Sequence, residues 1–236
     1  MWATRYGYFE DETEYVLAMD AIKPHIEGIA KEIKADYDPE HAFFPYILSF
    51  SNSLDSEYLW KHFGCEVMLI FDRMLLFSYC HHYTESEHKL TMCHDVNYSE
   101  SEDIHPIIAK TYNELQKEFA DNPIEMLYEV PAFIKDKKRF QNENEFRLVR
   151  GFNDMFSFST STETFKDCEE PPAALKFRIN KANKLTPYIE ILLPKQALVG
   201  LCLNNTIKEE NIDAVRLMLT ARNYDIGIFN SVIQHI

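Results

Sequence analysis

The sequence has 236 residues, of which 46% are hydrophobic and 14% aromatic, enough for one large or two small domains. Its formal net charge of −14 argues against non-specific binding to nucleic acid or to an anionic membrane, because contacts with phosphates need a basic surface. The 5 cysteines are widely spaced without a CxxC pair, and neither a signal peptide nor a membrane span is visible, so we expect a cytoplasmic protein with reduced thiols.

Helices are predicted to dominate residues 1–140. Apolar side chains recur every three or four positions over residues 15–33 and again over 104–119, as expected of amphipathic helices. Residues 124–140 are also predicted to be mainly helical. The basic run that begins at Lys135 then suits the C-terminus of that helix, where the macrodipole favours cations.

Shorter elements are predicted between these helices. The aromatic segment 43–51 and the continuous apolar run 67–71 are predicted strands, and the second of them is expected to be buried. A short helix over 58–63 should separate them, with Ser53 or Asp55 as its N-cap. Together with a further strand predicted just before the second long helix, this gives an irregular order of elements.

Strands are predicted to dominate residues 141–236, interrupted by a polar loop over 151–172 and by one helix that opens near Thr206. The strands are expected over residues 175–179, 188–193, 198–203 and 225–232. The pattern favours one α+β domain over residues 1–236, with a mixed, largely antiparallel sheet flanked by helices, and not a regular βαβ alternation.

The segment QNENEFRLVR, residues 141–150, turns from polar to alternating within a few positions. If it is extended from Glu143 onward, Glu143, Glu145 and Arg147 share one face and the apolar side chains point to the core. Such a face is either a site for chemistry or a solvated surface with an Arg–Glu pair that contributes little to stability.

Hydroxyl and aromatic side chains provide further candidates. Ser49 and Ser51 share a face of the predicted strand 43–51, where they can position the polar groups of a ligand. The alternative is capping of the following helix by Ser51 or Ser53. Trp60 is either a stacking surface or a buried core residue.

Other kinds of site are poorly supported. Histidines and cysteines gather over residues 80–94 without the paired spacing of zinc sites, so we expect a solvated loop with buried cysteines and no metal. The sequence contains no GxGxxG or Walker pattern and no GxSxG, which argues against Rossmann, P-loop and serine-hydrolase chemistry.

Five segments, taken in order, resemble a known family: MWATRYGYFEDETEY, LSFSNSLDSEYLWKHFG, VNYSES, FIKDKKRFQNENEFRLVR and TPYIEILLPKQALVGLCL. Across nearly the whole chain the sequence resembles the bacterial domain-of-unknown-function family catalogued as number 2971. Its polar elements more distantly resemble those of the ADP-ribosyltransferase superfamily. That resemblance implies a split β-sheet core with nicotinamide adenine dinucleotide (NAD) bound in a cleft.

The resemblance assigns roles to the polar residues. Ser49-Phe50-Ser51 looks like the Ser-x-Ser strand and Glu143-Asn144-Glu145 like the Glu-x-Glu motif, with the register beginning at Gln141 as an alternative. Glu145 would stabilise the positive charge on the ribose as nicotinamide leaves, and Glu143 would orient or deprotonate the acceptor. Arg147 would hold the carboxylates ionised or contact a phosphate.

The superfamily also has an Arg or His on its first strand. In the resembling family a strand with a His-Tyr-Thr-like motif precedes the stretch at which this sequence begins, so Arg5 is the nearest substitute. Arg5 and Trp60 are the remaining residues that are expected to contact NAD. The implied function is NAD-dependent ADP-ribosyl transfer to an unknown macromolecule in a toxin or defence setting. The alternatives are NAD hydrolysis and a non-catalytic binding or interaction protein that keeps the fold.

Overall fold

The structure is a computed structural model that describes most of the chain outside the N-terminal region and the central loop. The described residues are 1–5, 23–24, 27–28, 30–32, 45–87, 91–100, 104–118, 129–150, 176–180 and 183–233. Most of the helix predicted over 15–33 and all of the loop predicted over 151–172 lie outside them. None of the described helices is both long enough and apolar enough to cross a membrane.

The chain divides into two compact units, and each takes residues from both sides of residue 140. The first unit consists of Met1–Phe50 and Cys80–Leu192, and the second of Ser51–Tyr79 and Leu193–Ile236. Strands and helices both occur in each unit. The chain is therefore α+β with mainly antiparallel sheets, as the sequence predicts.

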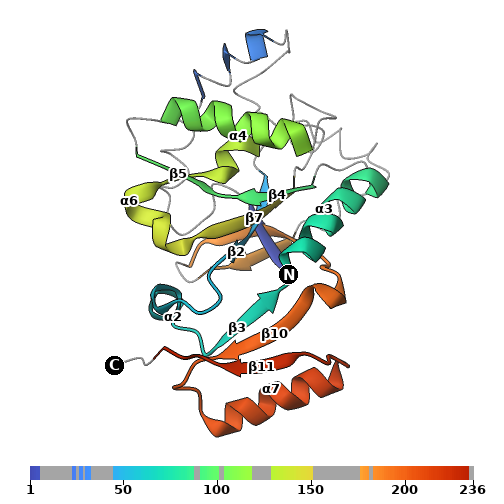
Figure 1. Ribbon diagram of the computed structural model, residues 1–236. Helices are drawn as coiled ribbons and strands as arrows, with labels where there is room; N and C mark the ends of the chain where they lie inside the picture. Colours follow the sequence, from blue (N-terminus) through green and yellow to red (C-terminus); the bar gives the residue numbers. More distant parts are fainter. Residues whose placement is uncertain are drawn as a thin grey trace. The chain divides into compact units, whose positions relative to one another are not determined.

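The first unit contains a six-stranded sheet with the order β4-β7-β2-β1-β9-β8 (Figure 1). Its described strand pairings are antiparallel. The strands are β1 (Trp2–Arg5), β2 (Tyr46–Ser51), β4 (Thr91–Asp95), β7 (Glu145–Arg150), β8 (Lys176–Ile179) and β9 (Leu185–Glu190). Strand β7 lies between two neighbours, and all of its residues are buried.

A second, two-stranded sheet in this unit pairs β5 (Asn97–Ser99) with β6 (Ile134–Asp136) in parallel. Strand β6 follows a 3-10 turn over Val130–Phe133 and leads into the short helix α6 (Lys137–Phe140). The prediction of a helix that continues across Lys135 is therefore wrong, because this segment pairs with β5. Lys135 is on a strand and is buried.

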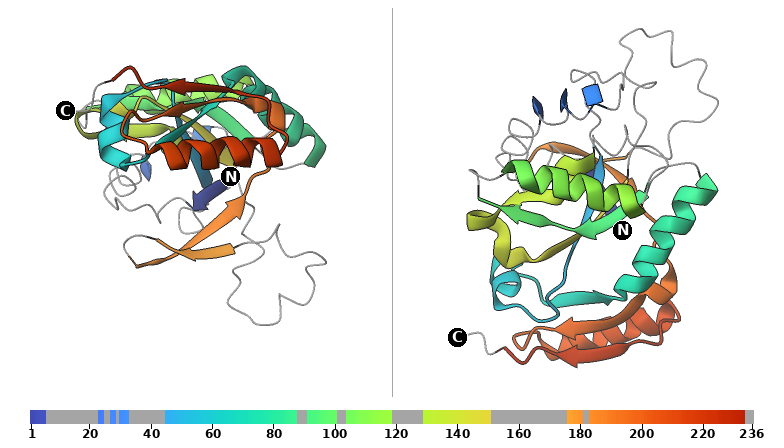
Figure 2. Two further views of the ribbon diagram at one scale, coloured as in Figure 1. Left: turned by 90° about the horizontal axis from the view of Figure 1, so that it is seen from below. Right: turned by 45° about the horizontal axis from the view of Figure 1, so that its top comes forward.

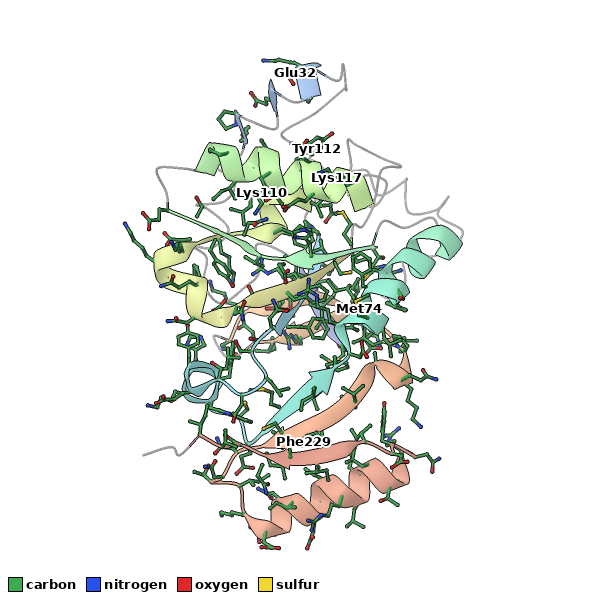
Figure 3. All side chains as sticks on the ribbon, viewed as in Figure 1. Glu32, Met74, Lys110, Tyr112, Lys117 and Phe229 are labelled. Atoms are coloured by element: carbon green, nitrogen blue, oxygen red, sulfur yellow. The ribbon has the colours of Figure 1, made fainter. Side chains whose placement is uncertain are left out.

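Helix α4 (Ile104–Glu118) has the amphipathic character that the apolar spacing predicts. Ile108 and Leu115 are almost completely buried, since they lie seven residues apart on one face of the helix. Figure 3 shows Lys110 and Lys117 along the same helix, where both are exposed. The helix thus contributes one apolar face to the core of this unit.

The second unit contains a three-stranded sheet with the order β11-β10-β3, in which β11 is parallel and β3 antiparallel to β10. Helix α7 lies beside β10 and β11 in both views of Figure 2. The elements are α2 (Glu57–Phe63), β3 (Val67–Phe71), α3 (Arg73–Glu87, with residues up to Tyr79 in this unit), β10 (Leu198–Leu203), α7 (Glu209–Ala221) and β11 (Gly227–Asn230).

Two details of this unit differ from the sequence prediction. The N-cap of α2 is Ser56, whose hydroxyl accepts the Leu59 N–H, and not Ser53 or Asp55. Strand β3 is half-buried and not fully buried, because it is an edge strand, and Leu69 is 43% exposed. Helix α2 ends at Gly64, which adopts the left-handed conformation with φ 57°.

Candidate functional site

The turn before β7 sets the position of the two candidate glutamates. Residues Gln141–Glu143 form a 3-10 turn, and Asn144 then adopts a left-handed conformation with φ 45°. Strand β7 begins only at Glu145, so the prediction that Glu143 is part of the strand is wrong. Glu145 and Arg147 do share one face of β7, because they are two residues apart on a strand.

Lys135 forms ion pairs with both carboxylates, although Glu143 lies in the turn and Glu145 lies on β7. Its Nζ atom lies 2.6 Å from Oε2 of Glu143 and 2.8 Å from Oε2 of Glu145. The side chains of all three residues are largely buried, with exposed fractions of 4%, 12% and 9% in the order Lys135, Glu143 and Glu145. One ammonium group from β6 therefore serves carboxylates from the turn and from β7.

Arg147 is the second cation. Its Nη2 and Nε atoms lie 3.0 Å and 3.2 Å from Oε2 of Glu145, and its Nη1 donates to the Ala132 carbonyl at 2.7 Å. The Arg147 side chain is 1% exposed. The alternative of a solvated Arg–Glu pair is therefore wrong. Lys135, Glu143, Glu145 and Arg147 form what we call the buried ionic cluster, and with both carboxylates ionised its charges balance.

The electrostatics of the cluster favour the ionised form of Glu145. Burial raises the pKa of its carboxyl group, but the charges of Arg147 and Lys135 and a hydrogen bond from Ser49 outweigh burial and hold the pKa below its ordinary value of 4.5. The Glu145 N–H donates to the Tyr98 hydroxyl at 2.8 Å, and burial raises the pKa of that phenol to about 12. Glu145 is thus a fixed anion at neutral pH.

Ser49 connects the cluster to the surface. A hydrogen bond from Ser49 contributes to the lowered pKa of the Glu145 carboxyl group, yet the residue itself is exposed on β2. Ser51, two residues further along, is half-buried, and its hydroxyl accepts the Ser53 N–H at 3.1 Å. The described contact of Ser51 is therefore one of the turn after β2, whereas Ser49 belongs to the candidate site.

Arg5 and Trp60 are the other residues that the resemblance assigns to NAD binding. The backbone of Arg5 pairs with Tyr46 between β1 and β2, and its side chain lies outside the described part of the structure. Trp60 belongs to the second unit, where it is 2% exposed and its indole N–H donates to Asp55 at 2.6 Å. Asp55 also accepts hydrogen bonds from Ser231, which makes Trp60 part of a core polar contact.

Of the residues considered as metal ligands, the structure describes the side chains of Cys80, Cys93 and His94, and these have other contacts. Cys80 on α3 and Cys93 on β4 are buried free thiols, and their mutual hydrogen bond, with burial, raises the pKa of Cys80. His94 lies 3.6 Å from a Glu114 carboxylate oxygen. No group of three possible metal ligands occurs among the described residues, and the side chains of residues 81–90 are not described.

Lys135 and Tyr98 are the site residues that sequence reasoning missed. Lys135 follows the apolar residues Phe133 and Ile134 directly, and a lysine at the end of an apolar run was the available signal. The basic residues that follow it suggested a helix C-terminus instead. Tyr98 lies in the segment VNYSES, but nothing in that segment distinguishes it as a site residue.

Comparison with known proteins adds nothing to this geometry: no family model, no curated protein and no solved structure matches the chain.

Proposed function

We propose that this chain is an ADP-ribosyltransferase-like protein that acts on NAD, with Glu145 as the residue that stabilises charge. The observation that carries the proposal is the buried carboxylate of Glu145, which Lys135 and Arg147 contact on a strand next to β2, the strand of Ser49 and Ser51. A Ser-x-Ser strand next to a Glu-x-Glu motif is the arrangement that the sequence resemblance implies.

The chemistry of NAD cleavage fits a fixed anion. The C–N bond between ribose and nicotinamide breaks, the bonding electrons leave with nicotinamide, and positive charge develops on the ribose. A preorganised carboxylate stabilises such charge better than water does. The low pKa of Glu145 suits this role, and it does not suit a proton donor at neutral pH.

The cations of the cluster have a positioning role in this proposal. Lys135 and both of the Arg147 nitrogen atoms that contact Glu145 lie against its Oε2 atom. These contacts fix the orientation of the carboxylate, and Ser49 or Oε1 would then receive the ribose hydroxyl. Glu143, which pairs with Lys135 as Glu145 does, would orient the nucleophile of the acceptor. The new bond forms between that nucleophile and the ribose, and a proton is released.

The proposed setting is the bacterial cytoplasm, with a macromolecule as acceptor and a toxin or defence role. The free thiols of Cys65, Cys80, Cys93 and Cys202 accord with a reducing compartment. We also propose that the chain belongs to the family that its sequence resembles.

A non-catalytic role is the second candidate, and the pairing within the cluster favours it. Each carboxylate of the cluster contacts a buried cation, and the cluster ties β6, β7 and the Ala132 carbonyl together. Buried ion networks of this kind also occur as purely structural features. In that case the protein would keep the fold and bind a partner without turning over NAD.

Labelled NAD separates these candidates. The protein is incubated with a bacterial lysate and NAD labelled in either the nicotinamide or the adenylate part. We expect nicotinamide release and label on macromolecules, and a loss of about 100-fold or more in Glu145→Gln, as found when a charge-stabilising group is removed. Glu57→Gln is the matched control, because Glu57 is exposed and paired with Lys61.

The outcomes are distinct. Nicotinamide release without label on macromolecules would identify a hydrolase. No release by the wild-type protein would favour the non-catalytic role. Unchanged label transfer by a folded Glu145→Gln variant would remove Glu145 from the mechanism.

A further inference from the structure

A hollow of about 310 Å3 lies in the second unit. All of the residues that line it belong to that unit, and none of them is a member of the buried ionic cluster. It is lined at the N-terminal ends of β10 and β11, where Leu198, Val199 and Ile226 provide apolar walls and Tyr224 an aromatic one. Ligand sites are mainly apolar and begin at about 300 Å3. The volume therefore suits a small metabolite.

Lys195 supplies a fixed positive charge to this hollow. Its Nζ atom donates to the carbonyls of Arg222 and Asn223, at 3.1 Å and 2.5 Å, and lies 4.8 Å from the centre of the Tyr224 ring. An ammonium group has three donors, and these carbonyls use two of them. The cation is thus held in place with one donor left for an anionic group.

Asp225 supplies the opposite charge on the same lining. Its side chain is exposed, and among the residues that the structure describes it forms no ion pair. One cation and one anion beside an apolar wall match a ligand that carries both charges and an apolar side group.

We infer that this hollow binds a free apolar α-amino acid. The carboxylate of the ligand pairs with Lys195, its ammonium group with Asp225, and its side chain packs against Leu198, Val199 and Ile226. The ligand needs all three features, so a carboxylic acid or an amine alone fits less well. This site is independent of the function proposed for the buried ionic cluster.

Titration calorimetry with L-phenylalanine tests the inference, with phenylacetate and phenethylamine as analogues that lack one charge. We expect phenylalanine to bind at least tenfold more tightly than either analogue. Lys195→Met and Asp225→Asn should each lose tenfold or more in affinity, and Lys195→Arg should lose less than Lys195→Met. Lys208→Met is the matched control, since Lys208 is an exposed lysine of the same unit that lies outside the hollow.

Folding of the variants is checked separately by the fluorescence of Trp60, which is buried in the same unit. Equal affinities for phenylalanine and its analogues would overturn the inference, and so would the absence of heat with phenylalanine. Equal effects of Lys195→Met and Lys208→Met would do the same. None of these results depends on NAD.

Discussion

Glu145 contacts Lys135 and Arg147 through the same oxygen atom, in surroundings that leave little of any of the three side chains exposed. Burial of unpaired charge is costly, and the cations are stable there because the carboxylates balance them. The stability of this unit therefore depends on each member of the cluster being present.

Glu145→Gln should strongly destabilise the protein. The substitution leaves Lys135 and Arg147 with one carboxylate between them, and breaking a buried pair in this way costs about 3–5 kcal/mol. Urea unfolding monitored by circular dichroism measures the change. Glu57→Gln removes one partner of an exposed pair and should cost less than about 1 kcal/mol. Equal costs for the two variants would show that burial of the cluster is unimportant.

The same carboxylate predicts how stability depends on pH. The pKa of Glu145 is lower in the folded protein than its ordinary value of 4.5, so the unfolded chain binds more protons in acid. The stabilisation is fully present above pH 4.5 and is lost as the pH falls through the folded pKa. The difference in urea midpoint between wild type and Glu145→Gln should therefore shrink below pH 4.5. A difference that stays constant down to the acid limit of folding contradicts the assigned shift.

At the scale of single residues, the sequence predicts the features that depend only on residues close together in the chain. The shared face of Glu145 and Arg147 follows from the period of a strand, and the structure confirms it. Lys135 could not be predicted as a partner of Glu145, because β6 and β7 come together only in the folded chain.

At the scale of elements, Asn144 determines how the 3-10 turn connects to β7. Its left-handed conformation joins the turn to the strand, and Glu143 and Glu145 on either side of it reach the same ammonium group. Asparagine tolerates this conformation better than most residues, and glycine adopts it without steric cost.

Asn144→Ala should therefore destabilise the protein by about 1–2 kcal/mol, the cost of a left-handed conformation for an ordinary residue. Asn144→Gly should cost less, because glycine removes the steric conflict. Thermal and urea unfolding of the pair provide the comparison. If glycine is as harmful as alanine, the side chain of Asn144 matters and its backbone conformation does not.

The N-cap of α2 offers a second comparison between elements. Ser56→Ala removes the hydroxyl that accepts the Leu59 N–H and should cost about 1 kcal/mol. Ser53→Ala should cost less, since Ser53 does not cap the helix. A larger loss in urea midpoint for Ser53→Ala than for Ser56→Ala would show that Ser53, which the sequence suggested, is the N-cap.

The elements differ in how far the sequence predicts them. Helix α4 is predicted because its apolar spacing is a property of one segment, and Leu115 is buried as expected. Strand β6 is not predicted, because a strand of three residues exists through its pairing with β5. The cap of α2 was missed because several neighbouring residues have capping side chains.

For the molecule as a whole, charge sets the clearest expectation. With a formal net charge of −14, the protein should repel polyanions such as nucleic acid and should not bind them non-specifically. In a gel-shift assay at physiological salt we expect no retardation of a non-specific DNA duplex. Retardation that weakens as salt rises would reveal a basic surface that the net charge conceals.

One property links the fold, the buried ionic cluster and the proposed reaction: Glu145 must be ionised at neutral pH. The most direct measurement is a pH titration of the Glu145 side-chain carboxyl carbon by NMR, with the resonance assigned from the Glu145→Gln variant. A midpoint below the ordinary value of 4.5 is the predicted result. A midpoint at or above that value would contradict a carboxylate held ionised by Lys135 and Arg147, and with it the role proposed for Glu145 in NAD cleavage.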